Sequence, residues 1–568
     1  MTSSSKKKKT VKAEEQYTVL STAQSEVSAD RKKSASQATD SYGSFVSTWL
    51  KPISFVAGLA VSSYLLLRIL DYYISDGTHS YVDVLFLDRA EDVGDAIGGV
   101  SEVLIAILGL VVTVVAIVVQ LAAQRYTPKL VDLFVEDTVN ISFFVLMVVA
   151  SMYSMLLIYS TTTGFIPFWG AFFLLVMTTV ILSLLIPYFS YVFRFLTPGN
   201  IIRIIRQNAK GAMGRVLNPK IRKEEIRRHQ QNVAMAMEQI SDISLSAVSQ
   251  MDRNVALLSI RSLKDVMVDH LLIKRKMPTG WFVPIKEHFP AISTDFFQEL
   301  YSGRNWVEMK GFLDMDLIFK NAVTAMPDAV SAIANSTKII GLYAIKLKDN
   351  QVLSDVIQFF NTFLRHAINA RNPKAIYNLF YQYRLLAEEV LIVNPQQTER
   401  IAFYFKYYGQ IAQTYNIPLI LITACFDLAH LLRRAYMMKV PNLEALVDTF
   451  LEIDDNPATQ ANEFELRSVR KAQLMFASFM VSQGEVKLVE KIVNDIKVEP
   501  KDRMVAIHKE MMAVKDRKFW EVTDRGVDFF YLDDDQKKWL NELFTTYIDP
   551  YYEKKNGKGK NGKGKNGK

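Results

Sequence analysis

Apolar stretches long enough to cross a lipid bilayer are the feature that most constrains the fold of this 568-residue chain. A bilayer core of ~30 Å needs about 20 helical residues at ~1.5 Å rise per residue. The sequence predicts four spans of this kind, near residues 53–70, 97–123, 141–159 and 166–192. The last contains Pro187, which a membrane helix tolerates as a kink where neighbouring helices supply backbone partners.

The charges that flank these spans predict their orientation. Basic residues are frequent before the first span, as in Lys6–Lys9, and again after the fourth span, from Arg194 to Arg228. The loop between the first two spans is acidic, with seven carboxylates from Asp71 to Asp95 against Arg89 alone. Cytoplasmic loops carry an excess of lysine and arginine. We therefore expect both termini and the long C-terminal part in the cytoplasm.

Small and polar residues follow one face of the second expected span. Spacings of three or four residues place them above one another on a helix that is otherwise rich in Val, Ile and Leu. Such a face either packs closely against other helices or lines a water-filled path, and the sequence leaves both open. Its residues are Glu102, Ala106, Gly109, Thr113, Ala116, Gln120 and Gln124, and Asp95 continues the face into the acidic loop.

The region after the spans predicts helices that are separated by proline and glycine breaks. One apolar face runs from Leu353 to Ala367, and after a break at Asn372–Pro373 the next runs from Ile376 to Val390. Further breaks fall at Pro395, Pro418 and Gly484. This pattern favours stacked helical hairpins that resemble an α-solenoid of the tetratricopeptide kind. The aromatic residues between 377 and 408 are expected to form packing contacts rather than a binding cage.

The predicted fold class is therefore all-α, a polytopic membrane protein with a large cytoplasmic helical domain. The tail is built on the unit N-G-K-G-K and is too polar to fold, and its lysines explain most of the net charge of +8, so no nucleic-acid partner is indicated. Contact of this tail with anionic lipid is a further expectation. The expected parts are a disordered basic segment at 1–44, a membrane domain at 45–198, a juxtamembrane helical region at 199–300, a helical-repeat domain at 301–550 and the disordered tail at 551–568.

The sequence lacks the short motifs that usually carry catalytic chemistry. It contains no phosphate-binding loop, no dinucleotide fingerprint, no H-E-x-x-H and no G-x-S-x-G. The seven histidines are dispersed, and the single cysteine, Cys425, excludes disulfides within the chain. The run Asp533–Asp535 is interpreted as a helix cap or a solvated patch. We expect no enzyme, no metal site and no cofactor.

One stretch, at the inner end of the second span, resembles a known family. Residues 120–137 read Q-L-A-A-Q-R-Y-T-P-K-L-V-D-L-F-V-E-D and are similar, without gaps, to Q-L-A-S-S-Q-F-S-P-R-L-L-x-x-F-x-x-D. That signature belongs to a bacterial four-helix membrane protein family, domain of unknown function twenty-two fifty-four. Ser246–Ile260 occupies the place of a second family motif, which contains Asn-Asp-Pro, whereas here Asp252 is followed by Arg253. The resemblance covers residues of about 90–265 and implies a bacterial inner-membrane location and no established activity.

The first of these stretches also makes physical sense as an elbow where the helix leaves the membrane. Pro128 is expected to end the helix, and Arg125 and Lys129 to lie among the inner headgroups. Residues 130–134 are expected to form a short interfacial helix. The residues of this elbow motif are Arg125, Tyr126, Thr127, Pro128, Lys129, Phe134 and Asp137.

Two classes of function remain open. The first is a homo-oligomeric ion channel or conduit, with Asp95 and Glu102 at an acidic outer mouth and the helical domain as a sensor or vestibule. The second is a membrane-anchored scaffold that recruits a protein partner through its helical domain. The sequence favours the conduit slightly, because a bare anchor needs neither four spans nor a helix with a polar face.

Overall fold

The structure is a computed structural model, which describes residues 62, 64–70, 73, 90–126, 128, 130–162, 167–290, 292–455, 463–519 and 525–553. Every element assigned in these residues is a helix. Contacts divide the chain into two compact units, Met1–Gln124 with Pro128–Leu196, and Arg125–Thr127 with Thr197–Lys568. The predicted segment 1–44 and residues 554–568 of the predicted tail lie outside the described residues.

The first unit contains three helices that are long and apolar enough to cross a bilayer. They are α2 (Ala90–Arg125), α4 (Thr138–Ser160) and α5 (Phe168–Phe195), and the short α3 (Leu130–Val135) lies between α2 and α4 in the sequence. Three of the predicted spans fall on these helices, although α5 begins at Phe168 and not at residue 166. The predicted span at 53–70 lies outside the described residues except for 62 and 64–70.

Close packing in this unit involves small and hydroxylated residues. A Cβ atom added at Gly170 of α5 would lie 2.6 Å from Cδ1 of Leu157 on α4, so glycine permits this approach. The Tyr153 hydroxyl donates to the Gly170 carbonyl oxygen at 3.2 Å. Ser101 of α2 and Ser154 of α4 share a buried hydrogen bond of 2.9 Å. The side of α2 that meets α4 is therefore the side that carries Ser101.

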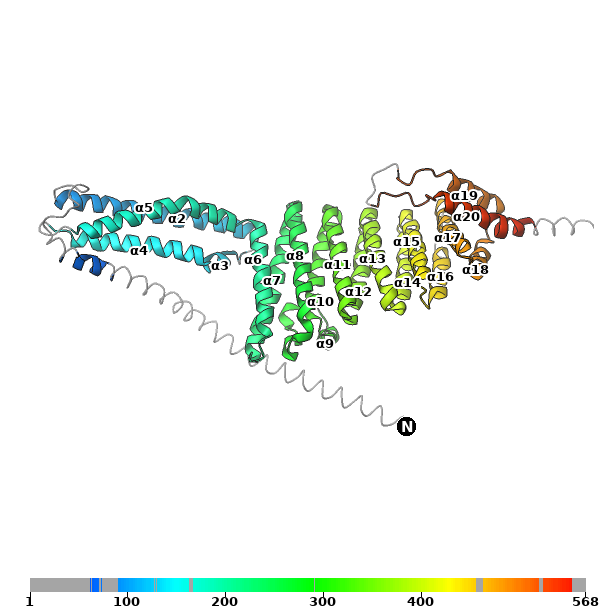
Figure 1. Cartoon of the computed structure of the whole chain (residues 1–568), viewed down its shortest axis with the longest axis horizontal. Coiled ribbons are helices and arrows are strands. Elements are labelled where there is room, and N and C mark those ends of the chain that lie inside the picture. The colour runs from blue at the N-terminus through cyan, green and yellow to red at the C-terminus, as the bar shows by residue number, and fades with distance from the viewer. Residues whose placement is uncertain are drawn as a thin grey trace, which may run out of the picture. The chain divides into compact units, whose positions relative to one another are not determined.

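The second unit is a row of helices, and Figure 1 shows those from α7 to α17 side by side. Connections between consecutive helices are mostly short, as at Met326 between α10 and α11. Its helices are α6 (Pro198–Val216), α7 (Lys223–Ser249), α8 (Arg253–Ile273), α9 (Thr294–Gly303), α10 (Trp306–Ala325), α11 (Pro327–Leu347), α12 (Asn350–Asn369), α13 (Pro373–Val393), α14 (Pro395–Thr414), α15 (Pro418–Met437), α16 (Leu443–Leu451), α17 (Glu463–Gln483), α18 (Val486–Ile496), α19 (Lys501–Ala513) and α20 (Asp534–Leu543). Short 3-10 or π turns occupy Lys274–Lys276, Thr279–Phe282, Lys286–His288, Glu452–Asp454 and Phe544–Ile548.

The proline breaks mark where helices of this row begin. Pro373, Pro395 and Pro418 are the first residues of α13, α14 and α15. Proline suits this position, since its fixed φ is helical and its missing N–H would have no partner there. The side chain of Asn372 caps α13 by accepting from Ala375 N at 3.0 Å. The turn at Gly484 has a φ of 75°, which glycine adopts without strain.

The aromatic residues between 377 and 408 divide between core and surface. Phe380, Tyr383 and Phe405 are fully buried and stack edge to face, in agreement with the predicted packing role. Phe403 and Tyr407 of α14 are 49% and 36% exposed, so these two do not belong to the core. Helical spacing alone does not separate the two groups, because both faces of α14 carry aromatic rings.

A glycine at the junction of α7, α8 and α10 provides a test of the core packing. A Cβ atom at Gly311 would lie 2.4 Å from Met267 Sδ and 3.0 Å from Met237 Cε. We expect Gly311→Leu to lower the free energy of unfolding by about 1–3 kcal/mol through overpacking. Urea unfolding of the detergent-solubilised protein, followed by circular dichroism, measures this change.

Gly214 on α6 is the matched control for this substitution. A Cβ atom there meets no atom within 4 Å. Gly214→Ala is therefore expected to raise the free energy of unfolding by about 0.5–1 kcal/mol, because alanine loses less backbone entropy in a helix. Equal stability of the Gly311→Leu and wild-type proteins would show that the three helices do not meet as closely as described.

Candidate functional site on the second span and its elbow

Helix α2 has one buried face and one exposed face. Leu104 and Val111 are each 1% exposed, and Ser101 also lies on the buried face. The predicted small and polar face lies on the exposed side of α2 in the described part of the chain. All eight of its residues are exposed: Asp95, Glu102, Ala106, Gly109, Thr113, Ala116, Gln120 and Gln124.

The middle of this exposed face is open and only mildly polar. A Cβ atom at Gly109 would meet nothing within 4 Å. The Thr113 hydroxyl donates to the Gly109 carbonyl oxygen at 2.8 Å, which satisfies the hydroxyl inside the helix. Among the residues that the structure describes, the side chains of Glu102, Gln120 and Gln124 form no hydrogen bond or ion pair with one another or with the rest of the chain.

The elbow after α2 is organised by Asp137. Its carboxylate caps α4 by accepting from Val139 N at 3.1 Å and Asn140 N at 3.2 Å. The same oxygen accepts from the Tyr191 hydroxyl of α5 at 2.8 Å. The ring of Phe134 packs edge to face on Phe195, with centroids 5.5 Å apart. The predicted short helix after the span is present as α3, and two residues of the predicted motif anchor it to the bundle.

The other elbow residues are placed differently. Helix α2 ends at Arg125, three residues before the exposed Pro128, as expected for a helix that proline terminates. Tyr126 is partly buried, and burial raises the pKa of its phenol more than the neighbouring Arg125 lowers it. Thr127 and Lys129 lie outside the described residues.

Arg125 meets the turn between α7 and α8, a contact that sequence reasoning missed. Its contacts group it with the second unit, and its Nε donates to Gln250 Oε1 at 3.1 Å. Asp252, which caps α8, lies 3.7 Å from Arg125 Nη2. The Ser246 hydroxyl donates to the Arg125 carbonyl oxygen at 2.7 Å. These residues come from the two stretches that resemble family motifs, and that shared resemblance is the signal that could have paired them.

A buried polar cluster connects α8, α10 and α12. His270 Nδ1 and Glu308 Oε1 are 2.6 Å apart, and both side chains are fully buried. Trp281 Nε1 donates to His270 Nε2 at 2.9 Å. On α12, Asp355 accepts from Asn305 Nδ2 at 2.5 Å, and burial raises the pKa of its carboxyl to about 7. No sequence pattern indicated this cluster, because its members lie far apart in the chain.

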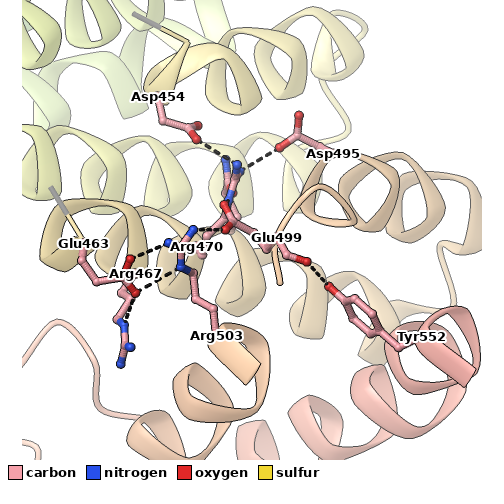
Figure 2. A network of polar contacts seen from close by, with 9 residues as sticks. Asp454, Glu463, Arg467, Arg470, Asp495, Glu499, Arg503 and Tyr552 are labelled. Atoms are coloured by element: carbon pink, nitrogen blue, oxygen red, sulfur yellow. Dashed lines mark hydrogen bonds and ion pairs between the residues drawn. The ribbon is translucent and has the colours of Figure 1, made fainter. Parts of the chain in front are cut away.

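A second buried cluster surrounds Arg470 of α17 (Figure 2). Its guanidinium pairs with Asp454 Oδ2, Asp495 Oδ2 and Glu499 Oε1, each at 2.9 Å. Tyr552, near the end of the described chain, donates to the Glu499 carbonyl oxygen at 2.7 Å. The Arg470 side chain thus connects its own helix, α17, with the turn at Glu452–Asp454, with α18 and with the residue Glu499 that follows α18.

Neither cluster gathers ligands for a metal ion. Within the described ranges no three His, Cys, Asp or Glu side chains come together as a metal site. The run Asp533–Asp535 contains the N-cap of α20, where Asp533 accepts from Gln536 N at 2.8 Å, in agreement with the interpretation as a cap.

Fold and site together define a membrane protein with three candidate spans and a large helical domain. Residues 46–229 match the family described as Predicted membrane protein (DUF2254). The match begins before the predicted resemblance at 90–265 and ends before Ser246–Ile260.

Two other comparisons add little. No curated protein matches the chain. A solved structure described as a "Circular tandem repeat protein with novel repeat topology and enhanced subunit contact surfaces" is similar at 13% sequence identity and a TM-score of 0.26, over 64% of this chain and 98% of that one. A likeness at this level establishes neither function nor partners.

Proposed function

We propose that the protein is a homo-oligomeric membrane conduit for cations, in which copies of α2 surround a path lined by its small and polar face. The observation that carries this proposal is the exposure of all eight residues of that face. Their exposure leaves the face available to another copy of the chain, to the predicted first span, to lipid or to water.

The chemistry of the face argues against lipid. Glu102, Gln120 and Gln124 carry polar groups that hydrocarbon does not satisfy, and such groups in spans mostly face protein or a water-filled cavity. Twenty residues from Val103 to Ala122 cover about 30 Å, so Glu102 and Arg125 bracket the bilayer core. In an oligomer, Asp95 and Glu102 form carboxylate rings that concentrate cations at one mouth.

The charge pattern supports an arrangement with four spans and both termini in the cytoplasm of a bacterial inner membrane. The acidic mouth then faces outward, and the helical domain acts as a cytoplasmic vestibule or sensor. In this proposal the protein is not an enzyme and takes no cofactor.

Purified protein in liposomes tests the proposal. We expect flux of monovalent cations above that of protein-free vesicles, and Glu102→Gln should reduce cation-over-anion selectivity. Glu136→Gln removes the same charge from an exposed site off this face, in the loop after α3, and should leave selectivity unchanged. Absence of flux under voltage, tension and osmotic gradients would contradict the conduit.

Cysteine accessibility distinguishes a water-lined face from a packed one. The chain offers a clean background, since its single cysteine, Cys425, is fully buried. Ala106→Cys and Ala116→Cys in the oligomer should react with a water-soluble thiol reagent. Leu110→Cys, on the exposed but off-stripe side of α2, should stay unmodified in the bilayer. Protection of all three would favour close packing instead.

A membrane-anchored scaffold is the second candidate, favoured by the exposed aromatic pair on α14. Phe403 and Tyr407 stack with their ring centroids 6.2 Å apart and are both exposed. Aromatic residues are enriched in protein interfaces. In this alternative the helical row recruits a protein partner, the basic tail contacts anionic lipid, and reconstituted protein shows no flux.

A further inference from the structure

A basic pocket of about 520 Å³ lies between α6 and α8 in the second unit. Its apolar floor includes Ile202 and Leu258. Pockets that hold small ligands usually measure about 300–1,000 Å³. Its polar lining consists of Arg203, Arg206, Gln207, Lys210 and Ser262, with no carboxylate among the lining residues.

The three cations lie on one face of α6 because they are spaced by three and four residues. Two carboxylates of α8 fix two of them. Arg206 pairs with Asp265 at 2.8 Å and with Asp269 at 3.4 Å, and Asp269 also pairs with Lys210 at 3.2 Å. A guanidinium has five N–H donors and an ammonium three, so both cations keep donors for a ligand.

The hydroxyl of Ser262 adds a hydrogen-bond donor to this lining. Ser262 is only 6% exposed and lines the pocket. In the part of the chain that the structure describes, no partner is found for its side chain. A phosphate oxygen in the pocket would accept from this hydroxyl.

The covalent connection to α5 places the pocket close to the end of a candidate span. Helix α5 ends at Phe195, and Gly199, which also lines the pocket, follows four residues later. Four residues extend at most about 14 Å. The polar headgroup zone adds about 5–8 Å on each side of the hydrocarbon core. Gly199 is therefore at most about 14 Å from the end of this span, which makes a lipid headgroup a candidate ligand for the pocket.

We propose that this pocket binds the phosphate headgroup of an anionic phospholipid. Arg203 and Lys210 contact the phosphate, Ser262 donates a hydrogen bond, and Ile202 and Leu258 contact the glycerol and the first acyl carbons. A headgroup of this kind matches the charge of the lining, the apolar floor and the position after α5. The inference does not depend on the conduit, because its readout is ligand binding rather than flux.

Titration of the full-length protein in a neutral detergent tests the proposal. Dioctanoyl phosphatidylglycerol is the probe, with dioctanoyl phosphatidylcholine and inorganic phosphate as comparisons, and calorimetry measures the Kd. We expect phosphatidylglycerol to bind most tightly. Arg203→Gln combined with Lys210→Gln should weaken its binding about thirtyfold, as expected for two cations near an anionic lipid.

Two further variants separate the pocket from general charge effects. Arg215→Gln with Lys220→Gln removes the same charge from exposed sites outside the pocket and should leave the Kd within about twofold. Leu258→Trp fills the pocket without a change of charge and should weaken binding at least tenfold while circular dichroism stays unchanged. The proposal would be overturned if the two double variants that remove charge lost the same affinity for phosphatidylglycerol. It would also be overturned if the wild type bound phosphatidylglycerol and phosphatidylcholine equally tightly. Inorganic phosphate that binds as tightly as the lipid and competes with it would assign the pocket to free phosphate instead.

Discussion

Replacing Arg470 with alanine is expected to lower the free energy of unfolding by about 3–5 kcal/mol, the usual cost of leaving buried charges without their partner. Arg470 is 5% exposed and pairs with Asp454, Asp495 and Glu499. Burial raises the pKa of Asp454 to about 6 even with the arginine present. Without it, three clustered carboxylates repel one another or take up protons.

Arg467, one turn earlier on the same helix, is the matched control. It pairs with Glu463 and Glu510, but its side chain is 31% exposed (Figure 2 shows both arginines). Because exposed ion pairs contribute about 0–1 kcal/mol, Arg467→Ala should have a small effect. Urea unfolding of the full chain in detergent compares the two variants. If both variants lost a similar free energy of unfolding, burial would not determine how much these ion pairs stabilise the protein.

The membrane helices could be predicted from sequence because the bilayer sets their length and excludes polar side chains along it. The runs that contain α2, α4 and α5 satisfy this condition without reference to any other part of the chain. Proline breaks likewise placed the starts of α13, α14 and α15, since proline acts on the local backbone. These are local rules, so one sequence is sufficient to apply them.

Partners that are distant in sequence could not be predicted. The periodicity of α2 showed a small and polar face, but only the packing of Ser101 against Ser154 shows which face the chain buries. Arg125 and Asp252 are 127 residues apart, and only the resemblance of their two stretches to motifs of one family connects them in the sequence. The buried charges of α8, α10 and α12 look like solvated positions of ordinary helices until tertiary packing encloses them. Such contacts depend on the whole arrangement of the row rather than on spacing along one helix.

The second large effect is a dependence of the free energy of unfolding on pH, which we expect from the carboxyl of Asp355. The pKa of its carboxyl is raised to about 7, mainly by burial; the hydrogen bond from Asn305 opposes this rise, and the nearby charge of Glu308 contributes to it. In the unfolded chain the pKa is close to 3.9. The folded state therefore binds more protons between these values, and the stability that this proton provides is present below pH ~4 and is lost as the pH rises through about 7. A shift of about three pKa units corresponds to about 4 kcal/mol.

Asp355→Asn isolates this contribution, because asparagine resembles the protonated carboxyl and its amide oxygen can still accept from Asn305. We expect the variant to match the wild type below about pH 4 and to be more stable at pH 8, by an amount that approaches about 4 kcal/mol. Asp328→Asn is the comparison, and its effect on stability should have the opposite sign. The hydrogen bond from Arg253 lowers the pKa of Asp328, so the charged carboxylate is the stabilising form and its loss should destabilise the protein at pH 8. Differences in unfolding free energy from wild type, measured at each pH, remove the other titrating groups from the comparison. A constant difference between Asp355→Asn and wild type from pH 5 to 8 would show that Asp355 is already ionised in the folded protein, and that the cluster around Glu308 is more open to water than its burial indicates.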